Sequence, residues 1–309
     1  MSDINVEKDG PMKISFALPQ NLNKRTVVRN PPKNLDRIDQ AKRPLDGKFI
    51  FPDSAGKDTN IFVIDTGIRV THKEFENRAR FGASFCKGCN DQDENGHGTQ
   101  VASVVAGKTF GVARKANLIA VRVLNANGDG TKSEVINGLS FVLSEHNKSQ
   151  NKNSIINMSI NGDLSDTINQ LIQDLTNAGV HVVVAAGNDA TDACNSSPSS
   201  ASSAITVGAT EENTDKIANF SNIGKCLDIF APGVNIIGAG NETDHDILVL
   251  SGTSQATPHV AGTIALIIAK NGNESPDQMA TTLTDLSTKN VIKGLKNGSP
   301  DSFLRTPAP

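Results

Sequence analysis

The stretch IFVIDTG (residues 61–67) decides the fold class, because four bulky apolar residues run directly into a carboxylate and a glycine. A short run of this kind, bounded by turn residues, is typical of a strand that is buried on both faces. Such strands form parallel sheets covered by helices. We therefore predict an α/β fold in which Asp65 emerges at the carboxyl end of a strand.

Apolar runs and helical patterns alternate along the rest of the chain. Further strands are predicted over residues 118–124, 155–160, 181–186, 204–209 and 227–231, and helices over residues 100–106, 133–146, 166–178 and 254–270. Strands separated by helices indicate a doubly wound, mostly parallel sheet flanked by helices. Because no internal repeat is present, one domain is the economical interpretation.

The N-terminal part differs from the rest. Residues 1–30 show no sustained periodicity, and Asn30-Pro31-Pro32 is typical of a boundary. We expect an N-terminal extension over residues 1–30 and a folded domain over residues 31–309. Basic residues gather between residues 24 and 43 with few acids among them. We interpret this stretch as a solvated strap rather than a binding patch.

Composition limits the classes of partner. The 309 residues carry a formal net charge of −3, with 37% hydrophobic and 20% charged residues. This charge gives no reason to expect nucleic acid or an acidic membrane as a partner, and no apolar run approaches the length of a transmembrane helix. The first residues lack the apolar core of a secretory signal. Such a signal either was never present or precedes Met1.

Three segments rich in small residues carry an aspartate, a histidine and a serine in that order: Asp65-Thr66-Gly67, Gly96-His97-Gly98-Thr99 and Gly252-Thr253-Ser254. A serine hydroxyl becomes a good nucleophile when a nearby base takes its proton, and a third group must fix the tautomer of that base. We assign Ser254 as nucleophile, His97 as base and Asp65 as the orienting carboxylate. The order Asp, His, Ser differs from the orders of chymotrypsin-type enzymes and α/β-hydrolases.

Asn188 follows the apolar run 182–187 and brings an amide to the end of a predicted strand. Alone, an asparagine after a glycine more often caps a turn. Beside the other three segments, we interpret the Asn188 side-chain N–H as a donor to the oxyanion that forms when serine attacks an amide. Ser254 supports this interpretation, since the start of its helix presents free N–H groups.

Other interpretations fail on residue order or identity. A nucleophile elbow around Ser254 needs a later acid and base, and the only later histidine is His259 in the same helix. We assign His259 and Pro258 to helix packing. An EF-hand at residues 91–96 needs a glutamate where Ala102 stands, although this acidic loop has the charge to hold an ion loosely. A dinucleotide-binding domain needs a glycine-rich turn after residues 61–64, and Asp65-Thr66-Gly67 does not provide one.

The segment SGTSQATPHVAG (residues 251–262) resembles the serine segment of the subtilase superfamily nearly throughout. VIDTGI (63–68), NGHGT (95–99) and AAGN (185–188) are similar to the other principal motifs of that family. The resemblance runs from about residue 31 to the C-terminus and is closest to the proteinase K branch. Two departures are Gln100, where histidine is usual, and Gln255, where methionine is common.

The resemblance implies a subtilisin-like fold and a serine endopeptidase that acts through an acyl-enzyme. It also implies broad specificity for apolar or aromatic side chains of polypeptide substrates. The alternative is a catalytically weak relative that binds peptides or inhibitors. A propeptide or protein inhibitor is a further partner of such enzymes. The propeptide that usually assists their folding is either missing from this sequence or represented only by its tail in residues 1–30. We expect a monomer.

By the same resemblance, peptides bind as an added strand between two edge segments. The implied residues are Gly128, Asp129 and Gly130 in one segment, Ser159, Ile160 and Asn161 in the other, and Ala185, Ala186 and Gly187 in the specificity pocket. Asn161 stands where glycine is usual, and Lys132 stands where an aromatic residue is often found. These departures leave the preferences of the subsites open.

Four cysteines suit two disulfides and an oxidising compartment, such as the secretory route or a vacuole or lysosome. Cys194 and Cys226 resemble a bridged pair in thermostable relatives of proteinase K. Cys86 and Cys89 allow a local disulfide, a redox pair or half of a zinc site. We favour the disulfide, because no second Cys/His pair lies nearby.

Structural calcium is the cofactor that the resemblance implies. Asp228 matches the carboxylate of a calcium site in the proteinase K branch, and the backbone carbonyls of Ser202 and Ala204 match its other ligands. The alternative is that Asp228 only caps the end of a strand.

Overall fold

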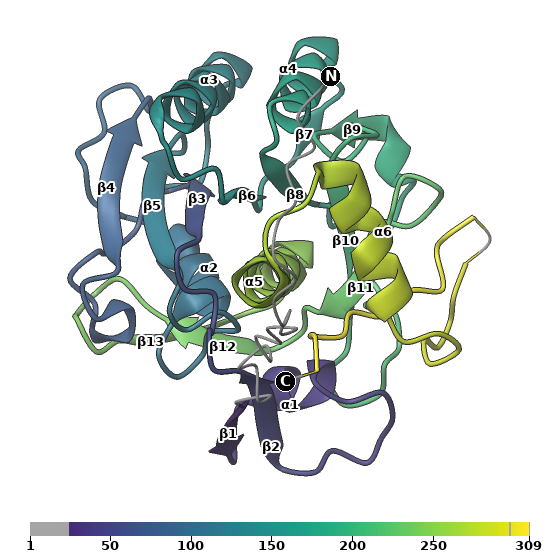
Figure 1. Cartoon of the computed structure of the whole chain (residues 1–309). Helices are drawn as coiled ribbons and strands as arrows, with labels where there is room; N and C mark the ends of the chain where they lie inside the picture. Colours follow the sequence, from purple (N-terminus) through teal and green to yellow (C-terminus); the bar gives the residue numbers. More distant parts are fainter. Residues whose placement is uncertain (1–24, 297, 309) are drawn as a thin grey trace, which may run out of the picture.

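A seven-stranded sheet forms the centre of the computed structural model, which describes residues 25–296 and 298–308 (Figure 1). All neighbouring strands run parallel, in the order β11-β10-β8-β6-β3-β5-β4. The strands are β3 (Asn60–Asp65), β4 (Ala79–Ser84), β5 (Asn117–Arg122), β6 (Ser154–Met158), β8 (His181–Ala185), β10 (Ile205–Thr210) and β11 (Ile229–Pro232). This topology confirms the predicted doubly wound α/β fold.

Helices cover both faces of the sheet (Figure 1). Helices α2 (His97–Ala106) and α5 (Thr253–Asn271) pack against each other on one face. Helices α3 (Lys132–Lys148) and α4 (Asp166–Asn177) pack together on the other. Each face has its own apolar core, which the alternation of side chains along the strands divides between the two helical layers.

Local capping fixes the starts of the peripheral helices but not those of the two helices that carry site residues. Thr131 and Glu134 form a capping box at the start of α3, and Ser165 caps α4. Helices α2 and α5 instead follow Gly96 and Gly252, neither of which has a capping side chain. The first N–H groups of α2 and α5 are therefore open to bonds from elsewhere.

The N-terminal boundary lies earlier than the sequence indicated. Residues 25–29, which we had placed in the extension, form β1 (Arg25–Arg29) and pair with β2 (Lys48–Pro52) in an antiparallel hairpin. Helix α1 (Lys33–Ile38) follows within the same strap. The other part of the predicted extension, residues 1–24, lies outside the described residues.

The basic strap is anchored in the fold, so its interpretation as a solvated segment was wrong for its central residue. Arg37 is fully buried, donates from Nε to Asp215 at 2.7 Å and lies 4.0 Å from the ring centre of Phe303. Asn34 Nδ2 donates to Nε2 of the buried His259 at 2.8 Å. Burial lowers the pKa of His259 to about 4, so its ring is neutral and packs, as predicted, within α5.

Several further elements, in addition to β1, β2 and α1, were not predicted from the sequence. The edge strand β4 has the sequence ARFGAS and is largely open to solvent. The others are the hairpin β12 (Ile236–Ala239) and β13 (Ile247–Leu250), the short pair β7 (Gly162–Asp163) and β9 (Ser196–Ser197), helix α6 (Pro276–Leu286), and two 3₁₀ turns (Lys73–Phe75 and Ala193–Asn195). Within the described ranges, no helix combines the length and the hydropathy needed to span a bilayer.

Candidate active site

The predicted site residues gather where the parallel strands end. Asp65 is the last residue of β3, and His97 is the first residue of α2. Ser254 is the second residue of α5, whose first turn lies near the chain that leaves β8. The fold therefore brings four distant segments to one edge of the sheet, as expected for an open parallel sheet.

Asp65 and His97 form a directed pair. His97 Nδ1 lies 2.8 Å from Asp65 Oδ1, which also accepts from Thr66 N at 2.7 Å. Asp65 is fully buried, and its Oδ2 has no hydrogen-bond partner among the described residues. A carboxylate in this position holds the proton on Nδ1 and leaves Nε2 free to accept one.

Two opposing effects set the basicity of His97. Burial lowers the pKa of the imidazole, but the Asp65 carboxylate, and to a smaller extent Asp93, raise it by more. The net pKa lies above the usual value, because both carboxylates stabilise the positive charge of the protonated ring. The geometry suits a base that takes up a proton as negative charge develops nearby.

The Ser254 hydroxyl is hydrogen-bonded to the residue that follows β6. Its Oγ donates to Ser159 O at 3.0 Å, and in return Ser159 Oγ donates to Ser254 O at 2.8 Å. Among the described residues, Ser254 makes no hydrogen bond with His97. Catalytic hydrogen bonds are often absent or long without substrate and form in the bound complex, so this orientation is compatible with the predicted role.

Hydrogen bonds to the side-chain oxygen of Asn188 fix the orientation of its amide group. Asn188 Oδ1 accepts from Thr253 N at 2.8 Å and from Thr253 Oγ1 at 3.0 Å. Thr253 Oγ1 also accepts from Gly187 N at 3.1 Å. The Asn188 Nδ2 group and the Ser254 N–H have no acceptor among the described residues, which leaves two donors available at the start of α5.

Asn222 holds the loop that carries Asn188, a role that no motif around this residue predicts. Its Oδ1 accepts from Asp189 N and Thr191 N, both at 3.0 Å, and its Nδ2 donates to Ala186 O at 2.9 Å. Asn222 is buried. A loop fixed on both sides of Asn188 keeps the amide in one orientation.

Asp93 is a second residue whose role in the site was not predicted, because the sequence around it resembles only the start of an EF-hand loop. Its buried carboxylate accepts five hydrogen bonds, which come from Thr66 Oγ1, Asn95 N, Gly96 N, Thr99 N and Thr99 Oγ1. These bonds join the turn after β3 to the start of α2. Asp93 therefore fixes the relative position of Asp65 and His97.

The two departures from the family motifs contact each other. Gln255 Nε2 donates to Gln100 Oε1 at 3.2 Å, and Gln100 Nε2 donates to Ile236 O at 3.0 Å. Both side chains are buried. They link the helix of Ser254 to the helix of His97, and the Gln255 amide finds its acceptor in the Gln100 oxygen.

Two hollows adjoin these residues. One, of about 450 Å³, lies between the segments 127–132 and 158–163 and reaches His97. The predicted groove residues Gly128, Asp129, Gly130, Ser159, Ile160 and Asn161 all line it. The other, of about 530 Å³, adjoins Ser254 and Asn188 and is lined by Ala185 and Gly187.

Ala186 does not line the second hollow, contrary to its predicted place. Its side chain is fully buried in a small apolar cluster with Ile217, Leu227 and Phe230. Successive side chains at the end of a strand point in opposite directions. Ala185 and Gly187 therefore face the hollow, while Ala186 faces the interior.

Both cysteine pairs form disulfides, Cys194–Cys226 and Cys86–Cys89. The alternative of a zinc site at Cys86 and Cys89 is therefore not supported, because both sulfurs are engaged in the disulfide. Across the described part of the chain, no three or more His, Cys, Asp or Glu side chains are grouped to hold a metal. A cation at Asp228 would have to take its other ligands from neutral oxygens, such as backbone carbonyls, side-chain amides or water.

Comparison with known proteins places this geometry in a family. Residues 56–300 match the model of the Subtilase family. "Subtilisin-like protease 3" of Pseudogymnoascus destructans is 46% identical over 271 residues, which cover 86% of this chain and 67% of that protein. "Extracellular serine proteinase" of Thermus sp. is 45% identical over 274 residues, which cover 88% of this chain and 65% of that protein.

A solved structure agrees with these relatives. The crystal structure of a cold adapted subtilisin-like serine proteinase superposes with a TM-score of 0.85 at 38% identity, covering 91% of this chain and all of that one. The chain spans about two thirds of the length of the curated relatives it matches. Because the family model spans residues 56–300, the chain belongs to the subtilase family.

Proposed function

We propose that this chain is a serine endopeptidase in which Asp65, His97 and Ser254 form the catalytic triad. The observation that carries the proposal is the buried Asp65 carboxylate 2.8 Å from His97 Nδ1. A carboxylate in this position orients the imidazole and stabilises the positive charge that the ring acquires as a base. The family of the chain and the names of its relatives support this reaction class.

The reaction begins when a rotation about the Ser254 Cα–Cβ bond replaces the contact with Ser159 O by one with His97 Nε2. Ser254 Oγ attacks the substrate carbonyl carbon as His97 takes the hydroxyl proton. The carbonyl oxygen becomes negatively charged and accepts from Asn188 Nδ2 and Ser254 N. His97 then donates its proton to the leaving amine, and water hydrolyses the acyl-enzyme by the same steps.

The groove supports an extended peptide bound between segments 128–130 and 159–161. Apolar side chains from Leu124, Val135, Met158 and Ile168 line the hollow beside His97. We propose that this hollow takes an apolar or aromatic substrate side chain, which gives broad specificity at a position away from the cleaved bond. Polypeptides are the substrates, and a propeptide or protein inhibitor would occupy the same groove of a monomer.

Hydrolysis of a peptide substrate with and without a serine-directed phosphonylating inhibitor tests this function. We expect hydrolysis that stops in proportion to the amount of inhibitor bound. Hydrolysis that continues after complete phosphonylation would contradict the proposal. A protein that binds peptides but neither cleaves them nor reacts with the inhibitor would be the catalytically weak relative.

The acid side of the pH profile should report His97 and respond to Asp93. His97 acts as a base only when neutral, so kcat/KM should rise with pH through its raised pKa. Asp93→Asn removes one of the two negative charges that raise this pKa, so the rise should move to lower pH. The variant also leaves at least one of five donors without an acceptor, which should cost about 1–3 kcal/mol of stability.

Asp91→Asn is the matched control, since Asp91 is exposed and lies two residues away. It should leave the acid limb and the unfolding temperature close to those of the wild type. Kinetics are measured across pH, with the active fraction determined by inhibitor titration. An unchanged acid limb in Asp93→Asn would show that Asp93 does not act on His97.

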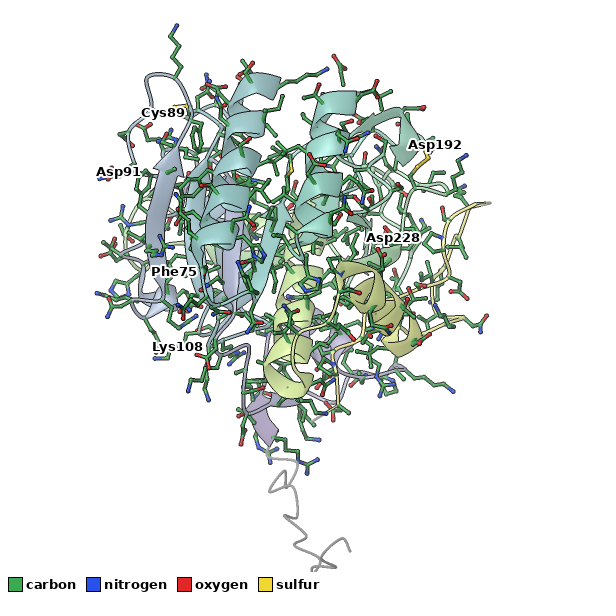
Figure 2. All side chains as sticks on the ribbon, turned by 45° about the horizontal axis from the view of Figure 1, so that its top comes forward. Phe75, Cys89, Asp91, Lys108, Asp192 and Asp228 are labelled. Carbon is green, nitrogen blue, oxygen red and sulfur yellow. A yellow bond between two sulfur atoms is a disulfide. The ribbon has the colours of Figure 1, made fainter. Side chains whose placement is uncertain are left out.

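We propose that structural calcium binds at Asp228 with the carbonyls of Ser202 and Ala204. Asp228 Oδ2 accepts from Thr206 N at 2.8 Å, which places the carboxylate beside the 202–204 turn. Burial raises the pKa of Asp228 to about 6, and no cationic side chain pairs with it in the described ranges. A bound cation would stabilise the ionised carboxylate and restrain the turn. Figure 2 places Asp228 and Asp192 on the opposite side of the molecule from Cys89 and Asp91.

Chelator should therefore speed thermal inactivation of the wild type, and added calcium should slow it in proportion to the free ion. Asp228→Asn should respond to neither. The Cys194–Cys226 disulfide closes a loop with a sequence separation of 32, which corresponds to about 3–4 kcal/mol in the chain-entropy model. Reducing agent should then speed inactivation independently of calcium. Equal inactivation rates for wild type and Asp228→Asn at every calcium level would leave Asp228 as a strand cap.

The two disulfides, and the extracellular location in the name of the Thermus relative, support a secreted protein. A vacuolar or lysosome-like compartment would also maintain the disulfides.

A further inference from the structure

The hollow beside Ser254 and Asn188, here called the acidic cavity, differs in chemistry from the groove. Its lining residues include Asp189 and Asp163, and Asp163 also lines the groove. Among the described residues that line it, there is no lysine, arginine or histidine. The apolar part of the wall is small, with the side chain of Ala185 beside Ile160. The lining next to Ser254 therefore carries two acidic residues and no basic one.

Asn161 narrows the acidic cavity and makes its wall polar. Its Nδ2 donates to Ser196 Oγ at 3.1 Å. The same Nδ2 and Asn222 Nδ2 both lie too close to Gly187 to leave room for a Cβ atom there, so the Asn161 amide lies next to Gly187. Ser196 also pairs with Asp163 across the β7–β9 ladder. Asn161, Asp163 and Ser196 thus form one continuous polar wall.

An aromatic side chain would fit this wall poorly. It would remove water from the carboxylates and the amide without offering them a hydrogen bond in return. A long cationic side chain would instead lay its methylene groups along Ala185 and Ile160 and bring N–H donors to the acids. Lys132 does not compete for these acids within the cavity, since it lines the groove and donates to Leu164 O at 3.0 Å.

We infer that the acidic cavity selects a lysine or arginine as the substrate residue whose carbonyl is attacked. This inference rests on the proposed function and specifies the class of substrate for that reaction. Asp163 and Asp189 supply the charge that selects the cation, and Asn161 reduces the room for an aromatic ring. An apolar or aromatic residue would then be preferred in the groove hollow beside His97 but not next to the cleaved bond.

Three peptide p-nitroanilides that differ only in this residue, with arginine, phenylalanine or alanine, test the inference on the full chain. The wild type should cleave the arginine substrate with kcat/KM about tenfold or more above the phenylalanine substrate. Asp189→Asn and Asp163→Asn should each lower this ratio, and the ratio should fall as ionic strength rises. Asn161→Gly should raise kcat/KM for the phenylalanine substrate.

Two controls separate specificity from damage. The alanine substrate gives a reference rate for each variant, so the ratio of arginine to alanine cleavage separates loss of cation selection from a general loss of activity. Asp285→Asn, an exposed position on α6 outside the cavity, should keep the wild-type ratio. All rates are normalised to the sites titrated by a phosphonylating inhibitor.

A phenylalanine substrate that is cleaved faster than arginine, with a ratio that does not change in the Asp→Asn variants, would overturn the inference. It would leave the proposed endopeptidase function intact, because cleavage would still occur. A protein that cleaves none of the three substrates and is not titrated by the inhibitor would overturn both.

Discussion

Ser254→Ala should lower kcat for peptide hydrolysis by about 10⁶-fold, since Ser254 is the proposed nucleophile and the members of a triad act as a unit. The residual rate would come from binding and the oxyanion donors. Adding His97→Ala to Ser254→Ala should cost little more, because a base has no function without its nucleophile. The losses of the two single variants are therefore expected not to add.

The measurement is kcat and KM for the two single variants and the double variant. Ser251→Ala is the matched control, because Ser251 lies on the same segment and its Oγ accepts one hydrogen bond, from Asn235 N at 2.8 Å. It should keep nearly normal turnover. Near-normal turnover in Ser254→Ala would require another nucleophile, and fully additive losses would show that His97 and Ser254 act separately.

Asn188→Ala should lower kcat by about 10²–10³-fold and leave KM almost unchanged. The Asn188 Nδ2 group has no acceptor within the described residues, so its bond to the oxyanion would be gained in the transition state. A contact that strengthens only in the transition state affects turnover and not substrate binding.

Asn188→Asp separates the donor from the structural role of this residue. The aspartate keeps an oxygen for the two bonds from Thr253 but has no N–H, and its charge would repel the oxyanion. Its kcat should fall at least as far as that of Asn188→Ala, with smaller loss of thermal stability. Turnover rescued by Asn188→Asp, or a loss confined to KM, would assign Asn188 to loop structure or to substrate binding.

The sequence predicted the features that depend on local pattern. The run 61–64 followed by Asp65 predicted a strand that ends in a functional carboxylate, because a buried apolar strand leaves polar groups only at its ends. The prediction that Ala186 lines the specificity pocket was wrong. The alternation of side chains along a strand points Ala186 to the opposite face from its neighbours Ala185 and Gly187.

The features that the sequence did not predict depend on contacts between distant segments. Asp93 gathers donors from residues 66 to 99, and Asn222 reaches the loop of Asn188 from another part of the chain. Gln100 and Gln255 were noted as separate departures, and only the packing of α2 against α5 brings their amides together. The burial of Arg37 could not be predicted either, because its partner Asp215 lies far away in the sequence.

The most direct test of the account is to locate the phosphonyl group after reaction with a serine-directed inhibitor. The protein is labelled to different extents, its residual peptide hydrolysis is measured, and peptide mass spectrometry identifies the modified residue. The account predicts one phosphonyl group per chain on Ser254, with activity lost in proportion to the label and His97→Ala strongly slowed in labelling. Full inactivation with the label on another residue, or full activity with Ser254 labelled, would contradict it.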